Sequence, residues 1–121
     1  MTEHDSRWMY RQMIDAMVVS CAGAGQVSAE RVRIGVWNDN ADEVPDVAPH
    51  QVVMNRVLSS LSHEQRQAVA ILFAEEYASG VYDALQVLHA ADCEPFSEGY
   101  DGEPCDDFLG RLDGWAWPES V

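Results

Sequence analysis

Four side chains in the second half of the chain have types and spacing that could support acid–base chemistry. Glu76 and Asp83 are seven residues apart, so on a continuous helix they share a face, with Tyr77 and Tyr82 beside them. If they lined a cleft, one carboxyl could have a raised pKa and act as a general acid while the other stayed ionised. The simpler interpretation is that these are solvated charges on a helix surface. The set is one candidate site, for a small ligand or an enzymatic reaction.

A second group of residues has side chains that could bind a metal ion. His89 and Cys93 are four residues apart at the end of an expected helix, and Cys105 follows across a loop. The paired ligand spacing of structural zinc sites is missing. Residues 38–49 begin like a calcium-binding EF-hand loop, but Glu replaces the turn glycine and Pro replaces the bidentate glutamate. The sequence therefore predicts no metal site.

Motifs for covalent catalysis or cofactor binding are missing from the sequence. No serine lies in a Gly-x-Ser-x-Gly elbow, and no cysteine lies in a recognisable nucleophile motif. Gly23 and Gly25 belong to neither a dinucleotide fingerprint nor a phosphate-binding loop. We therefore predict no catalytic residue and no cofactor. Whether the chain is an enzyme stays open, and the missing motifs favour a non-enzymatic protein.

The C-terminal tail concentrates aromatic and charged side chains where most chains are small and polar. Trp115 and Trp117 follow Arg111 and Asp113 closely in the sequence. Two free indoles would leave a large apolar area in water, so we expect the tail to dock. Arg111 is expected to stack on an indole and pair with an acid of the body, which closes the fold. Because Trp and Arg also dominate protein–protein contacts, partner binding is the alternative.

The charge balance of the chain is strongly negative. Twenty-one Asp and Glu residues oppose seven Arg and no Lys, for a formal net charge of −14. Such a surface repels nucleic acids and anionic membranes, and it suits a basic protein partner or simple solubility. Three cysteines without disulfide spacing, no signal-peptide pattern and no apolar run of about 20 residues favour a cytoplasmic protein.

Helical periodicity must position most of these side chains. Apolar residues recur at three- and four-residue steps in four segments, residues 5–21, 50–61, 63–79 and 81–88. Ser62 and Gln65 form a capping box before the third segment, and Gly80 is expected to end it. Short connections favour antiparallel packing of the last three helices.

The remaining segments lack a helical pattern. Residues 31–37 alternate apolar and polar side chains, which predicts an extended segment across the helices, since no second strand is available. Residues 38–49 and 92–106 are expected to be loops, and residues 107–112 one short helical turn. We therefore predict a single mainly α domain over residues 1–121. It is a small bundle of three to four helices with one extended segment and an ordered Trp-rich C-terminal tail.

A series of short motifs runs from Asn55 to Pro118 and ends in Arg-Leu-Asp-Gly-Trp-Ala-Trp-Pro. The earlier motifs are residues 61–66, Glu76 with residues 80–83, residues 85–88, residues 102–104 and Phe108. This half of the chain resembles an uncharacterised family of small bacterial proteins, a domain of unknown function. The resemblance implies helices followed by an ordered tail, and it brings no assigned activity. The family often has a histidine where Tyr82 stands, which weakens a site centred on Tyr82 and Asp83.

These observations lead to one preferred function and two alternatives. The preferred function is a non-enzymatic acidic interaction protein, immunity- or antitoxin-like or an accessory adaptor, that binds a basic protein partner. The first alternative is a small-ligand binder or enzyme with a pocket around Glu76, Tyr77, Tyr82 and Asp83. The second is a structural homodimer, in which the first helix or the tail is buried against a second copy.

Overall fold

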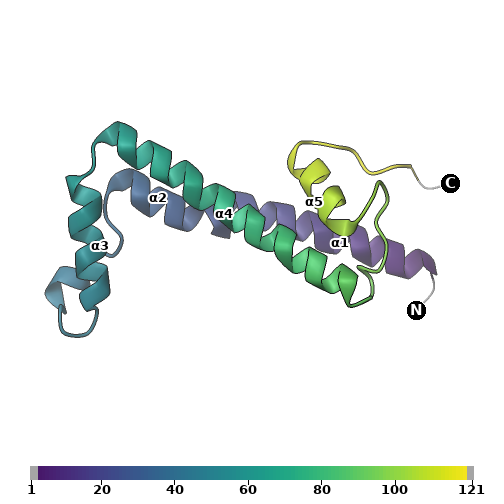
Figure 1. Cartoon of the computed structure of the whole chain (residues 1–121), viewed down its shortest axis with the longest axis horizontal. Helices are drawn as coiled ribbons and strands as arrows, with labels where there is room; N and C mark the ends of the chain where they lie inside the picture. The colour runs from purple at the N-terminus through teal and green to yellow at the C-terminus, as the bar shows by residue number, and fades with distance from the viewer. Residues whose placement is uncertain (1–2, 120–121) are drawn as a thin grey trace. The chain divides into compact units, whose positions relative to one another are not determined.

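The chain consists of helices and loops over the residues that the structure describes. The computed structural model describes residues 3–119, and this range holds no β-strand, so the predicted mainly α class is confirmed (Figure 1). The α-helices are α1 (Glu3–Ala22), α2 (Val27–Ile34), α3 (Pro49–Ser60), α4 (His63–Ala90) and α5 (Pro104–Leu112), and the 3-10 helices are η1 (Ala24–Gln26) and η2 (Ala41–Glu43). Within this range, none of the helices combines the length and the apolar character needed to cross a membrane.

The fold separates into two compact units, which are described one at a time. The terminal unit is Met1–Ala22 together with Tyr77–Val121, and the middle unit is Gly23–Glu76. α4 contributes its first half to the middle unit and its second half to the terminal unit. The organisation of the chain as a single domain stays a prediction.

The core of the terminal unit is built from α1, α4 and α5. Tyr10 and Ile14 of α1 pack with Leu85 of α4, Phe96 of the following loop and Phe108 of α5. The three- and four-residue spacing of the apolar side chains turns one face of α1 and one face of α4 inward, as predicted. α5 lies against α1.

α5 and the tail complete the terminal unit. α5 begins at Pro104, whose fixed φ suits the first helical turn, and the Asp106 carboxylate accepts a hydrogen bond from the Glu103 N–H at 3.0 Å. The helical turn predicted over residues 107–112 is therefore the later part of a longer helix. Trp117 packs against the core of the unit, which supports the predicted ordered tail.

The core of the middle unit is small. Ala29 and Val32 of α2, Leu58 of α3 and Ala70 of α4 are buried, and Trp37 packs against them. Two of these four buried side chains are alanines, which enclose little apolar area. Larger apolar side chains of α3 and α4 remain exposed on the surface of the unit.

The predicted extended segment over residues 31–37 is wrong, because α2 occupies its first part. Val32 is buried with Ala29, three residues earlier on the same helix face, whereas Ile34 is 59 % exposed. An unpaired extended segment would leave backbone N–H and C=O groups without partners, and a helix pairs them internally. Gly35 ends α2 at a φ of 82°, a left-handed conformation that glycine adopts at little cost.

The predicted break at Gly80 is also wrong, since residues 63–79 and 81–88 belong to one helix, α4. The capping box at its start is confirmed: the Ser62 hydroxyl accepts from the Gln65 N–H at 3.1 Å, and the Gln65 side-chain oxygen accepts from the Ser62 N–H at 2.9 Å. A glycine inside a helix costs about 1 kcal/mol relative to alanine, too little to interrupt the helical patterns on both sides. The two segments therefore cannot pack antiparallel to each other.

Replacing Gly80 by alanine tests the continuity of α4. A Cβ built at Gly80 meets no atom within 4 Å, so a methyl group adds helix propensity without a clash. We expect Gly80→Ala to raise the free energy of unfolding in urea by about 0.5–1 kcal/mol. Gly35→Ala is the control and should destabilise, because its Cβ would lie 2.5 Å from Arg66 Nη1 at a positive φ. A loss of stability in Gly80→Ala would contradict a continuous helix.

Candidate functional site

The terminal unit is organised around one buried carboxylate, that of Asp107 in the first half of α5. Asp107 is 1 % exposed. Its Oδ2 accepts hydrogen bonds from the Tyr10 hydroxyl at 2.5 Å and the Tyr100 N–H at 2.7 Å, and its Oδ1 accepts one from the Asp101 N–H at 3.1 Å. Burying a charge is costly unless such bonds replace its water. The carboxylate therefore joins α1, α5 and the loop that precedes α5.

Tyr10 is held in this arrangement as a neutral hydrogen-bond donor. Burial raises the pKa of its hydroxyl, and the hydrogen bond to Asp107 and the charge of that carboxylate raise it further. A hydroxyl that donates to a carboxylate forms a charge-assisted bond, which is stronger than a bond between neutral groups. The two residues are 97 positions apart, and no sequence motif marks them as a pair.

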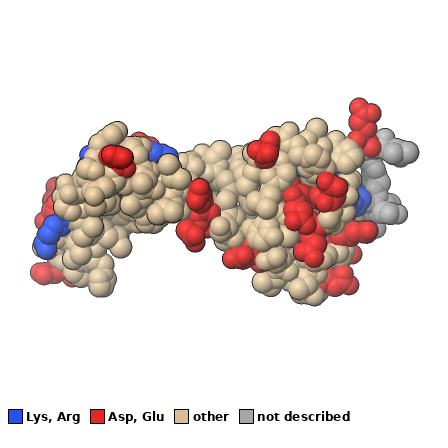
Figure 2. Space-filling model, turned by 45° about the horizontal axis from the view of Figure 1, so that its top comes forward, with Lys and Arg blue, Asp and Glu red and all other residues tan. Residues whose placement is uncertain are grey.

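Exposed carboxylates surround this anchor. We call residues 92–106 the acidic loop; they are the loop after α4 together with the first three residues of α5, and they include no Lys or Arg. Its exposed acids are Asp92, Glu94, Glu98, Asp101, Glu103 and Asp106. The terminal unit holds 13 of the 21 acidic residues of the chain, and Figure 2 shows acidic side chains gathered on its surface. The acidic loop is thus a dense group of negative charges on a defined backbone.

Two arginines of α1 bind aromatic rings and backbone oxygens rather than these acids. The Arg7 guanidinium lies 4.3 Å from the centre of the Tyr100 ring and donates to the Glu98 carbonyl at 2.9 Å. Arg11 donates to the Tyr100 hydroxyl at 2.9 Å and to the Pro118 carbonyl at 2.7 Å. Among the described residues, no arginine forms an ion pair with the acidic loop. Its negative charge is therefore not neutralised by the arginines of the same unit.

The tail is fixed by Arg111, the third arginine of the terminal unit. Arg111 Nε donates to Asp15 Oδ1 at 2.8 Å, and the Trp117 ring nitrogen donates to the other oxygen of the same carboxylate at 3.0 Å. The Arg111 guanidinium also lies 5.3 Å from the centre of the Trp117 ring and donates to the Trp115 carbonyl at 2.5 Å. These are the contacts expected of fold closure. Asp113 is exposed at the end of α5.

The predicted carboxylate and tyrosine set on α4 makes different contacts. Glu76 and Asp83 are exposed, and Tyr77 is 36 % exposed. Tyr82 is half-buried, and its hydrogen bond with Cys105 raises the pKa of its hydroxyl. One of the two tyrosines is thus directed to a thiol of α5. The ligand-binding and enzymatic hypotheses for this set stay predictions.

Of His89, Cys93 and Cys105, the residues considered as metal ligands, Cys105 is the one that lies in a group of potential ligands among the described residues. Cys105 lies with Glu103 and Asp106, with one potential ligand atom of each within 4.8 Å of the others. His89 Nε2 is 3.7 Å from a Glu103 carboxylate oxygen, and Cys93 is exposed. Burial raises the pKa of the Cys105 thiol and keeps it protonated, whereas a metal is bound by the thiolate.

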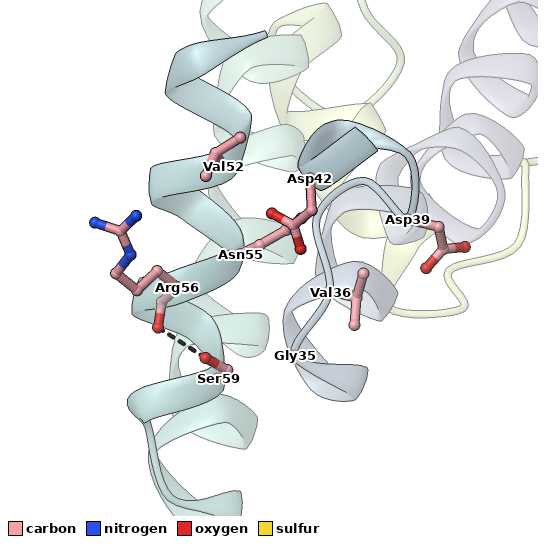
Figure 3. Close-up of a pocket in the computed structure, with 8 residues that line it drawn as sticks. All are labelled: Gly35, Val36, Asp39, Asp42, Val52, Asn55, Arg56 and Ser59. Carbon is pink, nitrogen blue, oxygen red and sulfur yellow. Dashed lines mark hydrogen bonds between the residues drawn. The ribbon is translucent and has the colours of Figure 1, made fainter. Parts of the chain in front are cut away.

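The middle unit contains a polar pocket of about 360 Å³ beside α3 (Figure 3). Its lining residues are Gly35, Val36, Asp39, Asp42, Val52, Asn55, Arg56 and Ser59. Asn55 fixes the segment after α2, since its Oδ1 accepts from the Trp37 N–H at 2.7 Å and its Nδ2 donates to the Asn38 carbonyl at 2.8 Å. In Figure 3 the Asp42 carboxylate faces α3, and the Arg56 guanidinium points away from that carboxylate. The lining residues come from the predicted extended segment 31–37, the predicted loop 38–49 and the predicted helix 50–61, and no sequence pattern indicated that they form a pocket.

Residues 3–119 match the family of unknown function DUF6547, and the chain belongs to that family. The match includes α1 and the middle unit, and so extends well beyond the part of the chain from Asn55 to Pro118 that carried the resemblance. No curated protein and no solved structure matches the chain. The family has no assigned function, so its match adds no catalytic or binding residues to those described above.

Tyr10→Phe tests the bond to the buried carboxylate. Removing a hydrogen bond to a charged group should lower the free energy of unfolding by roughly 1.5–3 kcal/mol at neutral pH. Because the pKa of Tyr10 is raised above its ordinary value of 10.0, this contribution is fully present below pH 10 and is lost as the pH rises further. Urea denaturation at several pH values should therefore show the difference from wild type narrowing above about pH 10. Tyr77→Phe is the control; an equal loss in both variants contradicts the assignment.

Asp15→Ala tests the closure of the tail. The substitution removes the acceptor shared by Arg111 and Trp117, so the tail should open more often. We expect trypsin to cleave after Arg111 about fivefold faster, measured by mass spectrometry, because proteolysis follows the open population. Asp113→Ala removes an exposed acid nearby and should leave the rate unchanged. Equal rates in wild type and Asp15→Ala would show that this carboxylate does not hold the tail.

Proposed function

We propose that this member of DUF6547 is a non-enzymatic interaction protein whose acidic loop binds a basic segment of a protein partner. The observation that carries the proposal is a group of six exposed carboxylates on a loop anchored by the buried Asp107. Immunity proteins, antitoxins and accessory adaptors are the kinds of protein that act in this way. The charge of −14 and the lack of catalytic motifs support the same function.

The order of the acidic loop favours specific binding over loose attraction. Asp107 binds two backbone N–H groups of the loop, and Arg7 binds the Glu98 carbonyl. A loop that is already ordered loses less conformational entropy when it binds. Its carboxylates can therefore act together on one partner segment, and their spacing selects among basic sequences.

The chemistry of the loop favours an arginine-rich partner. A carboxylate accepts two parallel hydrogen bonds from one guanidinium group, a geometry that lysine cannot provide. Nucleic acids and anionic membranes are repelled by the same charges. In the described residues no disulfide joins the three cysteines, which suits the reducing environment of the cytoplasm that we propose for this protein.

The test compares two variants that each lose four negative charges. The first neutralises acidic-loop residues, and its substitutions are Asp92→Asn, Glu94→Gln, Glu98→Gln and Asp101→Asn. The second neutralises acids of the middle unit, and its substitutions are Asp39→Asn, Asp42→Asn, Glu43→Gln and Asp46→Asn. Binding of a short fluorescent arginine-rich peptide at low salt is measured by anisotropy. We expect the loop variant to bind about tenfold more weakly and the middle-unit variant to stay close to wild type.

Equal weakening in the two variants would overturn the proposal, because binding would then follow net charge alone. The proposal also fails if a peptide with lysine at every arginine position binds as tightly as the arginine-rich one, since the bidentate geometry would then have no role. Raising the salt concentration should weaken the specific complex.

A further inference from the structure

The longest stretch of the sequence without an acidic residue is residues 47–63, which has no Asp or Glu in 17 positions. It contains the whole of α3 and carries Arg56 and two histidines. Acidic residues elsewhere make up about one position in five, so this stretch differs clearly from the rest of the chain. The helix α3 therefore adds no negative charge of its own to a strongly acidic protein, although Asp39 and Asp42 line the polar pocket beside it.

An apolar groove lies on this same region of the middle unit. Its volume is about 210 Å³, and its lining residues are Val32, Trp37, Val53, Met54, Val57, Leu58 and Phe73. Val53 and Val57 of α3 are each 51 % exposed, Met54 is 42 % exposed and Phe73 of α4 is 41 % exposed. Exposed apolar side chains gathered around a groove are typical of an interaction site rather than of scattered surface residues.

We propose that this surface binds a second copy of the same chain, in a two-fold arrangement that packs α3 against α3. A basic partner would find no carboxylates on α3 to pair with. Two copies of a chain with a charge of −14 repel each other over most of their surfaces, and that repulsion is weakest where each presents its acid-free helix. The charge pattern therefore favours a second copy as the occupant.

The shape of the surface fits a self-complementary contact. In a two-fold dimer the same patch is used by both copies, so a ridge and a groove on one patch can fill each other. Val53 and Val57 form an exposed pair one helical turn apart in the wall of the groove, which Met54 and Phe73 also line. The flexible Met54 side chain can adjust to the opposing valines. Burying these side chains also covers the small core of the middle unit.

The dimer and the proposed partner complex should respond to salt in opposite directions. Salt screens the repulsion between two acidic copies and strengthens their apolar contact, whereas it weakens the attraction between the acidic loop and a basic peptide. The inference does not rest on the proposed function, because the two surfaces lie in different units. A failure of one can therefore be told apart from a failure of the other.

Sedimentation equilibrium of the whole chain over a concentration series tests the inference. We expect wild type to approach twice the chain mass of 13.5 kDa, with a dissociation constant that falls when NaCl is raised from about 0.05 to about 0.5 M. Val53→Glu with Val57→Glu should raise the dissociation constant at least about a hundredfold, because two charges would be buried in the contact. Both positions are half-exposed in one chain, so circular dichroism should show the fold retained.

The matched control is Val19→Glu with Val87→Glu, which adds the same charge at two positions of the terminal unit that are each 68 % exposed. The control should dimerise like wild type. A wild-type chain that stays at 13.5 kDa at every concentration overturns the inference. Equal dimerisation of Val53→Glu/Val57→Glu and wild type also overturns it. Equal weakening of the dimer in the two double variants overturns it as well, because the effect would then follow net charge alone.

Discussion

The structure of the terminal unit depends on keeping one ionised carboxylate out of water. Asp107 is stable there because a hydroxyl from α1 and two backbone N–H groups from the acidic loop replace its solvent. The carboxylate and its hydrogen-bond donors stabilise each other. The carboxylate accepts hydrogen bonds from all three donors, and the two N–H donors, those of Tyr100 and Asp101, fix the path of the part of the acidic loop that precedes α5. Residues 97 positions apart in the sequence are thereby held together through one side chain.

The arginines explain why this unit keeps a negative surface. The terminal unit has three arginines, and each makes half-buried or exposed contacts within the unit: Arg7 and Arg11 with Tyr100 and with backbone carbonyls, and Arg111 with the tail. Asp15 forms an ion pair with Arg111 and also accepts a hydrogen bond from the Trp117 indole N–H. The guanidinium groups are therefore used in contacts of the fold, and six carboxylates of the acidic loop remain exposed. The middle unit differs in that one of its helices, α3, carries no acidic residue and has exposed apolar side chains.

Periodicity and capping predicted most of the helices, because those signals are local. The apolar steps of α1 and α3 and the box formed by Ser62 and Gln65 need no knowledge of distant residues. The wrong predictions were the helix break at Gly80 and the extended segment over residues 31–37, where a weak local pattern was outweighed by helix propensity or by backbone hydrogen bonding. Gly80 lowers helix propensity too little to end α4, and alternation alone cannot make a strand without a partner for its backbone. For the site, the tail's unusual composition predicted its docking and the role of Arg111. The pair of Tyr10 and Asp107 could not be found, since neither residue has a local signature.

Amide hydrogen exchange of the acidic loop, followed by NMR at single residues, tests whether the buried Asp107 carboxylate orders that loop. If the buried carboxylate orders the loop, the Tyr100 and Asp101 amides should be protected in the wild-type chain, because both donate to Asp107. Asp107→Ala should remove that protection at both positions while leaving amides in the first half of α4, in the middle unit, protected. Unprotected Tyr100 and Asp101 amides in the wild type, or protection that survives the substitution, would show that Asp107 does not order the loop.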